Sequence, residues 1–218
     1  MKSFQRLLVK YPKWIGKVLL LQVAVPSRTD VKEYRELKEE IDKLVGCING
    51  QFSTPAWSPI RSVCSHIFLV NLFSRLRYIF GCVSQDQLAA FYRDARVGLI
   101  TPLRDGMNLV AKEFAACQPE QDPGVLILSP FAGAGGYMQE ALQVNPYEVE
   151  NVADTLNRAL EMPLDERQLR MNQLKKREKK MDVDSWVQTF LQTMGAIYND
   201  TVTCTIAIKI SRLCKFFL

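Results

Sequence analysis

Several ingredients of common catalytic and metal sites are scarce in this chain. Its 218 residues include a single histidine, and none of its six cysteines forms a Cys-x-x-Cys pair. Structural and catalytic zinc sites need clustered cysteine and histidine ligands. We therefore expect no metal in this protein.

Long apolar runs and an excess of one charge are also lacking. No stretch reaches the roughly 18 uninterrupted apolar residues that span a bilayer, and Met1 to Arg6 do not form a secretory signal. The net charge is only +5, and the basic cluster at 175–180 has no interleaved aromatic residues. We interpret that cluster as a solvated helix face. We expect a cytoplasmic protein that binds neither nucleic acid nor membrane, and the cysteine usage fits a reducing compartment.

The residues that are present suit a globular domain. Hydrophobic residues make up 48% of the chain and charged residues 23%, which is enough apolar material for a core. Short apolar segments alternate with helical patterns, which predicts an α/β fold with a doubly wound parallel sheet and extra C-terminal helices. The expected strands are 18–25, 78–82, 97–100, 125–128 and 143–145. The expected helices are 31–45, 85–94, 107–117, 149–161, 164–180 and 183–198, with a loop at 46–59.

The most informative stretch runs from Thr101 to Gln118. It follows the apolar segment 97–100, which predicts a buried strand, and it opens a helix at about Met107. Asp105 and Gly106 lie between them, in the strand–turn–helix arrangement that binds anions and sugar hydroxyls. Ligands of such sheets bind beyond the carboxyl ends of the strands. We therefore expect this turn to converge with the turns at 25–30 and 129–136.

Five ordered blocks carry a family resemblance. The run Thr101-Pro-Leu-Arg-Asp-Gly-Met-Asn-Leu-Val-Ala-Lys-Glu113 resembles the signature of trehalose-6-phosphate synthases, which are retaining glycosyltransferases with two Rossmann-like domains. The other blocks are Gln22-Val-Ala-Val-Pro-Ser-Arg-Thr-Asp30, Ile48-Asn-Gly50 with Trp57-Ser-Pro-Ile60, Gly124-Val-Leu-Ile-Leu-Ser-Pro-Phe-Ala-Gly-Ala-Gly135 and Ala141-Leu-Gln-Val-Asn-Pro-Tyr147. The resemblance covers roughly Phe4 to Ile197.

The resemblance implies a fold and an activity. The fold is the Rossmann-like C-terminal half of a GT-B glycosyltransferase, with residues 1–199 as the nucleotide-sugar-binding domain and 200–218 as a divergent tail. The activity is transfer of glucose from UDP-glucose to glucose 6-phosphate with retention, in trehalose biosynthesis. UDP-glucose is the donor substrate and no cofactor is implied. The resemblance is also compatible with a homo-oligomer of the full-length enzyme.

The resemblance also implies roles for single residues. Asp105 matches the catalytic-site aspartate that accepts hydrogen bonds from the donor glucose, and Glu113 matches the glutamate that holds the two ribose hydroxyls. Arg28 matches an arginine that binds the phosphate of glucose 6-phosphate, and a guanidinium suits a phosphate. Val83 falls where the family's backbone contacts uracil. The amides of Gly106, Met107 and Asn108 would bind the same glucose, and Leu109 and Val110 would lie against the diphosphate.

Simpler interpretations of these residues stay open. Asp105 is also a favoured turn former, and Glu113 is equally a candidate exposed helix residue. Arg28 is alternatively a surface charge. The glycines between 133 and 136 are alternatively only a loop, and a polar or acidic residue usually stands where this chain has Gly136.

Two departures from the family pattern matter. Residues 61–76 interrupt a stretch of sequence that is normally contiguous in the family. They are either an added helix or strand, or translated intron sequence. We favour translated intron sequence. The only histidine, His66, lies in this stretch, so we do not assign it as a general base. The acceptor-binding first domain is not represented. We therefore expect a partial enzyme that binds donor but is inactive alone. The alternative is a non-catalytic sugar-nucleotide-binding or regulatory paralogue that partners a full-length subunit.

Overall fold

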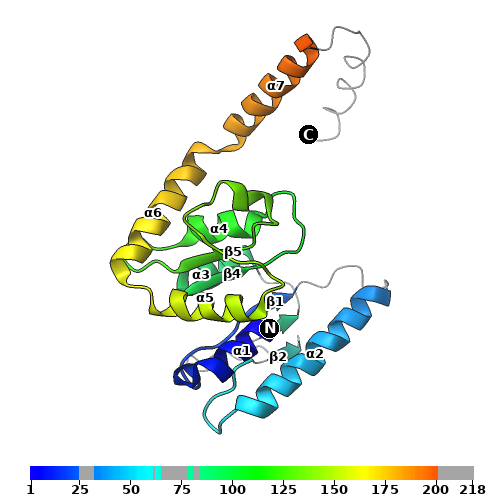
Figure 1. The fold of residues 1–218 in the computed structure, drawn as a ribbon, viewed down its shortest axis with the longest axis vertical. Coiled ribbons are helices and arrows are strands. Elements are labelled where there is room, and N and C mark those ends of the chain that lie inside the picture. The colour runs from blue at the N-terminus through cyan, green and yellow to red at the C-terminus, as the bar shows by residue number, and fades with distance from the viewer. Residues whose placement is uncertain (25–31, 61, 65–77, 81–83, 201–218) are drawn as a thin grey trace. The chain divides into compact units, whose positions relative to one another are not determined.

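The computed structural model describes residues 1–24, 32–60, 62–64, 78–80 and 84–200 (Figure 1). The chain divides into two compact units, Met1–Lys175 and Lys176–Leu218. The first unit contains two sheets, each of three parallel strands, in the orders β1-β3-β2 and β4-β5-β6. The strands are β1 (Gln22–Ala24), β2 (Ser62–Cys64), β3 (Tyr78–Phe80), β4 (Val97–Ile100), β5 (Val125–Leu128) and β6 (Leu142–Gln143). The predicted α/β fold with parallel strands is confirmed.

Helices alternate with these strands, as the hydrophobic pattern predicts. Helix α3 begins at the predicted residue because Ser84 forms a capping box with Gln87, which satisfies two backbone N–H groups at the helix start. The helices are α1 (Lys2–Lys10), α2 (Lys32–Phe52), α3 (Gln85–Asp94), α4 (Leu109–Cys117), α5 (Val149–Glu161), α6 (Leu164–Lys180) and α7 (Val183–Asp200), with 3-10 turns η1 (Pro12–Trp14) and η2 (Gly133–Gly136).

Strand β5 is the centre of its sheet and is buried on both faces. Val125 and Ile127 belong to one hydrophobic cluster, with residues of α1 and α5. Leu126 and Leu128 point the opposite way, into a second cluster with residues of α4 and α6. Figure 1 accordingly shows α4 and α5 on opposite sides of this strand. A parallel strand covered on both faces reads as a continuous apolar run, which is why the sequence pattern identified it.

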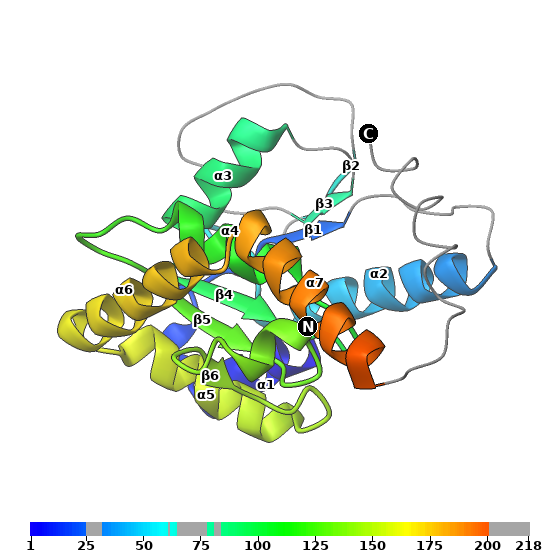
Figure 2. The same cartoon turned by 90° about the horizontal axis from the view of Figure 1, so that it is seen from above.

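Strand β4 is less buried than its sequence predicts. All four residues from Val97 to Ile100 are half-buried. In the described part of the chain β4 pairs only with β5, and Figure 2 shows it at the border of the β4-β5-β6 sheet. An edge strand has neighbours on one side only, so its residues keep part of their accessible surface.

Helix α2 corrects the expected loop at 46–59. The helix continues through Gly46 and Gly50 to Phe52. Val45 and Ile48 are almost fully buried, and Phe52 packs against the same cluster. Burial of this helical stripe outweighs the preference of about 1 kcal/mol against each helical glycine.

Other boundaries also differ from prediction. β1 begins at Gln22 instead of Val18, and β6 ends at Gln143. α4 begins at Leu109, two residues later than expected. Of the predicted insertion, Ser62–Cys64 forms β2 and pairs in parallel with β3, while 61 and 65–76 lie outside the described residues.

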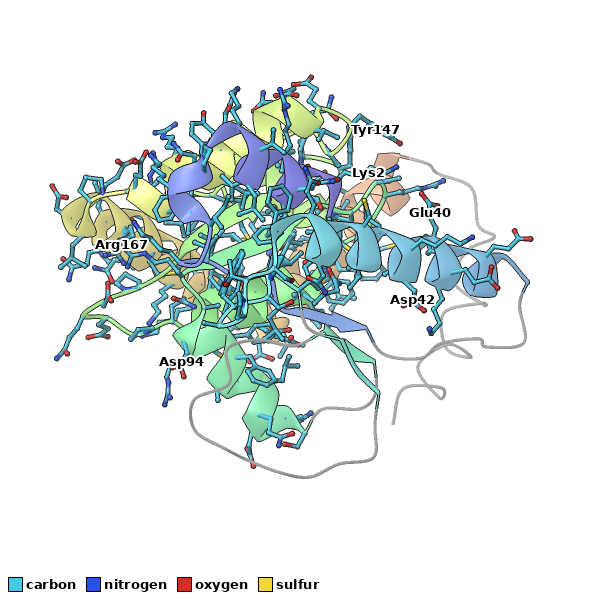
Figure 3. The ribbon with its side chains drawn as sticks, turned by 90° about the horizontal axis from the view of Figure 1, so that it is seen from below. Lys2, Glu40, Asp42, Asp94, Tyr147 and Arg167 are labelled. Atoms are coloured by element: carbon cyan, nitrogen blue, oxygen red, sulfur yellow. The ribbon has the colours of Figure 1, made fainter. Side chains whose placement is uncertain are left out.

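Helix α1 and the η1 turn that follows it are attached to neighbouring helices by polar contacts. The Tyr11 hydroxyl donates to Asp154 of α5 over 2.8 Å, and the Trp14 indole N–H donates to Asn157 over 2.9 Å. Lys2 of α1 and Glu40 of α2 lie 3.7 Å apart (Figure 3). These contacts, part-buried at Tyr11 and Trp14 and exposed at Lys2, orient the helix, whereas its apolar face supplies most of the stability.

Helix α7 belongs to the second unit. The rings of Trp186 and Phe190 stack with their centroids 5.5 Å apart, and both residues are exposed. Among the described residues, no helix of either unit is both long and apolar enough to cross a bilayer.

The buried face of α1 yields a stability prediction. Leu8 is fully buried, so Leu8→Ala leaves a cavity and is expected to lower the free energy of unfolding by about 2–5 kcal/mol. Leu169→Ala on α6 is the matched control, because Leu169 is 63% exposed and is expected to change stability by less than about 0.5 kcal/mol. Urea unfolding followed by circular dichroism measures both. Equal losses would contradict the placement of α1 in the core.

Candidate functional site

The turn between β4 and α4 is attached to the loop that follows β5. The N–H of Asp105 donates to the carbonyl of Phe131 over 3.2 Å, and the N–H of Gly133 donates to the Asp105 carbonyl over 3.0 Å. A third bond runs from the N–H of Ala134 to the Met107 carbonyl over 2.9 Å. The predicted convergence of the turns at 101–109 and 129–136 is therefore confirmed, and the turn at 25–30 lies outside the described residues.

Close approach of these two loops requires glycine at position 133. A β-carbon there would stand 2.1 Å from the carbonyl oxygen of Gly106. No side chain fits at that distance from a backbone atom. The glycine-rich character of this loop therefore has a packing reason, whereas a β-carbon at Gly136 would meet nothing within 4 Å.

Asp105 organises its own turn. Its Oδ1 accepts from the N–H of Met107 over 3.1 Å, and its Oδ2 accepts from the side-chain amide of Asn108 over 2.9 Å. Hydrogen bonds to the ionised form, from Met107 first and Asn108 second, hold the pKa of Asp105 below its ordinary value. The turn-forming interpretation of Asp105 is confirmed. A carboxylate has about four acceptor sites, so two bonds leave capacity for a ligand.

Asn108 connects this turn to the helix. It has φ of 74°, the left-handed region that asparagine tolerates better than most residues. Its Oδ1 accepts from the N–H of Ala111 over 2.9 Å and so caps α4. The helix begins at Leu109 for this reason. Leu109 and Val110 occupy the first two helical positions, are exposed, and carry N–H groups that have no carbonyl partner inside an α-helix.

Glu113 lies one turn further along α4 and is exposed. Its Oε2 accepts from the hydroxyl of Tyr92 on α3 over 3.2 Å. Burial first, and then the negative charge of Glu113, raise the pKa of Tyr92 to about 12. Sequence reasoning did not identify Tyr92, because its contact with Glu113 spans two helices and only the α3·α4 packing brings them together.

The predicted site residues from Asp105 to Val110, together with Glu113, therefore share one turn and the first turns of one helix. Arg28 and Val83 lie outside the described residues. Within the described ranges, no group of three or more histidine, cysteine, aspartate or glutamate residues is placed to hold a metal ion.

Comparison with known proteins places the chain in a family. The model for glycosyltransferase family 20 matches residues 1–196, so the chain belongs to this family. It is 37% identical over 214 residues to a trehalose-6-phosphate synthase from Enterobacter sp. (strain 638). That match covers 98% of this chain and 42% of the relative.

Two solved structures share the fold closely. An α,α-trehalose-phosphate synthase (UDP-forming) from Burkholderia xenovorans, in complex with glucose-6-phosphate, has a TM-score of 0.78 and 38% identity, over 89% of this chain and 40% of that one. An E. coli structure bound with UDP-2-fluoro glucose has a TM-score of 0.78 and 38% identity, over 88% of this chain and 39% of that one. The chain thus spans about two fifths of these proteins.

The approach of the two loops gives a testable difference between two glycines. Gly133→Ala is expected to destabilise the fold by about 1–3 kcal/mol, because the new methyl group would separate the loops. Gly136→Ala is the matched control and is expected to be nearly neutral. Thermal unfolding measures stability, and amide hydrogen exchange reports on the N–H of Gly133 and Ala134. Equal protection of these amides in both variants would rule out the proposed role of Gly133.

The pKa of Asp105 gives a second prediction. Because the folded chain favours the carboxylate, Asp105 stabilises the fold above its ordinary pKa of 3.8, and this contribution is lost as the pH falls through the lowered folded value. Asn108→Gly retains the left-handed backbone but removes the amide donor. We expect the Asp105 titration midpoint, followed by carbon-13 NMR, to rise toward 3.8 without reaching it, because the Met107 N–H remains.

Asp122 serves as the internal control in the same titration. The pKa of Asp122 is lowered mainly by its hydrogen bond from Arg167, and neither residue belongs to the Asp105–Asn108 turn. Its midpoint should not move in Asn108→Gly. An unchanged Asp105 midpoint in that variant would show that the Asn108 amide does not stabilise the carboxylate.

Proposed function

We propose that this chain is the donor-binding part of a UDP-forming α,α-trehalose-phosphate synthase. In this proposal the enzyme transfers glucose from UDP-glucose to glucose 6-phosphate with retention, and the chain binds UDP-glucose. The observation that carries the proposal is the Asp105–Asn108 turn at the start of α4, with a second carboxylate, Glu113, one helical turn beyond, in a member of glycosyltransferase family 20.

The turn has the chemistry to hold a hexose. Asp105 is half-buried, stays ionised, and has unused acceptor capacity after bonding Met107 and Asn108. We assign it to accept from hydroxyls of the donor glucose, which makes it the catalytic-site residue of the proposal. The backbone amides of Gly106, Met107 and Asn108 are assigned to the same sugar. The N–H of Met107 is engaged by Asp105 in this structure, so it would be shared with the ligand.

The first turn of α4 suits the diphosphate. Leu109 and Val110 are exposed residues at the positive end of the helix dipole, and a departing diphosphate carries negative charge. Glu113 is on the same helical face as Leu109, four residues on. An ionised carboxylate can accept from two vicinal hydroxyls, so we assign Glu113 to the ribose.

The remaining assignments rest on family likeness. Arg28 is proposed to bind the phosphate of glucose 6-phosphate, and the backbone at Val83 to contact uracil. The two solved relatives bound with glucose-6-phosphate and with UDP-2-fluoro glucose support these ligand classes. Transfer needs both substrates held together in one cleft. Because the chain spans about two fifths of its relatives, we expect this 218-residue polypeptide to bind donor without turnover.

The domain limits and the compartment are also proposals. We assign residues 1–199 to the donor-binding domain, with 61–76 as an insertion and 200–218 as a divergent tail. A cytosolic location is supported by the free thiols of Cys47 and Cys117.

The proposal predicts carboxylate-dependent binding of UDP-glucose. Isothermal calorimetry on the 218-residue chain is expected to detect it, and the Asp105→Ala/Glu113→Ala double variant is expected to weaken it at least about tenfold, since each carboxylate bond to a ligand contributes about 1.5–3 kcal/mol. A coupled assay for UDP release is expected to show no turnover with glucose 6-phosphate. Glu120→Ala, an exposed loop carboxylate, is the control and should bind as the wild type does.

Three results would contradict parts of this proposal. Undiminished affinity of the double variant for UDP-glucose would show that neither Asp105 nor Glu113 binds the donor. Turnover at the rate of a full-length enzyme would overturn the view that the chain is a partial enzyme. Absence of any UDP-glucose binding would favour a role as a regulatory paralogue without a donor site.

A further inference from the structure

Tyr92 contacts Glu113, the carboxylate that we assign to the ribose. It lies near the end of α3, and its hydroxyl donates to Oε2 of Glu113 on the neighbouring helix α4 over 3.2 Å. None of the motifs that define the candidate site includes this tyrosine. The contact therefore joins the site to a helix that supplies none of its other described residues.

The ring of Tyr92 is anchored to the core. It packs edge-to-face on Phe114, with ring centroids 6.5 Å apart and planes at 82°, and Phe114 is 2% exposed. The carbonyl of Tyr92 also accepts from the side-chain amide of Gln118, a buried residue whose Oε1 accepts from the N–H of Gly124 over 2.5 Å. The position of the hydroxyl is thus set by contacts on two sides of the residue.

Glu113 gains a defined orientation from this contact. An exposed glutamate side chain samples several rotamers, and ordering it on ligand binding costs free energy. The hydroxyl occupies one lone pair of Oε2 and leaves Oε1 and the remaining lone pairs for a ligand. The pKa of Tyr92, raised to about 12, keeps the hydroxyl protonated and hence a donor at neutral pH.

We propose that Tyr92 is a positioning residue for nucleotide binding: its hydroxyl holds the Glu113 carboxylate in the orientation that accepts from the two ribose hydroxyls. The inference rests on the proposed function, because it needs Glu113 to bind ribose. It adds a residue on α3 that acts through Glu113 without touching the ligand.

The test compares UDP with 2′,3′-dideoxy-UDP, which lacks both ribose hydroxyls. Dissociation constants are measured by calorimetry on the 218-residue chain for the wild type, Tyr92→Phe, Glu113→Ala and the Tyr92→Phe/Glu113→Ala double variant. Tyr92→Phe keeps the ring on Phe114 and removes only the hydroxyl. It is expected to weaken UDP about three- to tenfold and to leave dideoxy-UDP unchanged. In the Glu113→Ala background the same substitution should have no further effect.

Tyr11→Phe is the matched control, because the Tyr11 hydroxyl also donates to a carboxylate, that of Asp154, at the α1–α5 contact. It should leave both dissociation constants unchanged. Thermal unfolding of Tyr92→Phe is measured alongside, and a midpoint close to that of the wild type confirms that the ring still packs.

The outcomes separate this inference from the proposed function. If the wild type binds UDP no better than dideoxy-UDP, Glu113 does not hold the ribose and both ideas fail. If the wild type discriminates but Tyr92→Phe weakens both ligands equally, or weakens neither, the positioning role alone is overturned. A loss confined to UDP, and absent without Glu113, supports it.

Discussion

The bridge between two loops is the constraint on which the candidate site depends. Backbone hydrogen bonds at Asp105, Gly133 and Ala134 attach the turn after β4 to the loop after β5. β5 is covered on both faces and all four of its residues are buried, so the bridge connects a carboxylate-bearing turn to a strand of the core. A turn anchored in this way presents its polar groups in one arrangement before any ligand arrives, which lowers the ordering cost of binding.

Helix α4 fixes the position of Glu113 relative to this turn. The ring of Phe114 lies so close to Gly98 of β4 that a β-carbon there would be 2.9 Å from it. That contact sets how deeply the helix is seated, and Asn108 sets where it begins. Glu113 precedes Phe114 by one residue, which is about 100° around the helix, and its side chain is exposed. The distance between the two proposed ligand-binding carboxylates is therefore a property of a rigid helix and its cap.

Local sequence signals predicted the elements whose determinants are local. Ser84 and Gln87 form the capping box that starts α3 where it was predicted, and the apolar run at 125–128 correctly predicted strand β5. Prediction was wrong where distant contacts decide. Gly46 and Gly50 indicated a loop, yet burial of Ile48 extends α2 through both. Similarly, β4 was predicted to be a buried strand, yet its four residues are half-buried and, in the described part of the chain, it pairs only with β5.

The amino-acid sequence by itself determined the order of strands and helices, the family and the Asp105–Asn108 turn, because capping, turn chemistry and apolar periodicity act over a few neighbouring residues. Only the tertiary structure decided which loop meets that turn and which tyrosine meets Glu113. Those contacts join residues 20 or more positions apart. They depend on how helices and strands pack, and no local pattern in the chain specifies that.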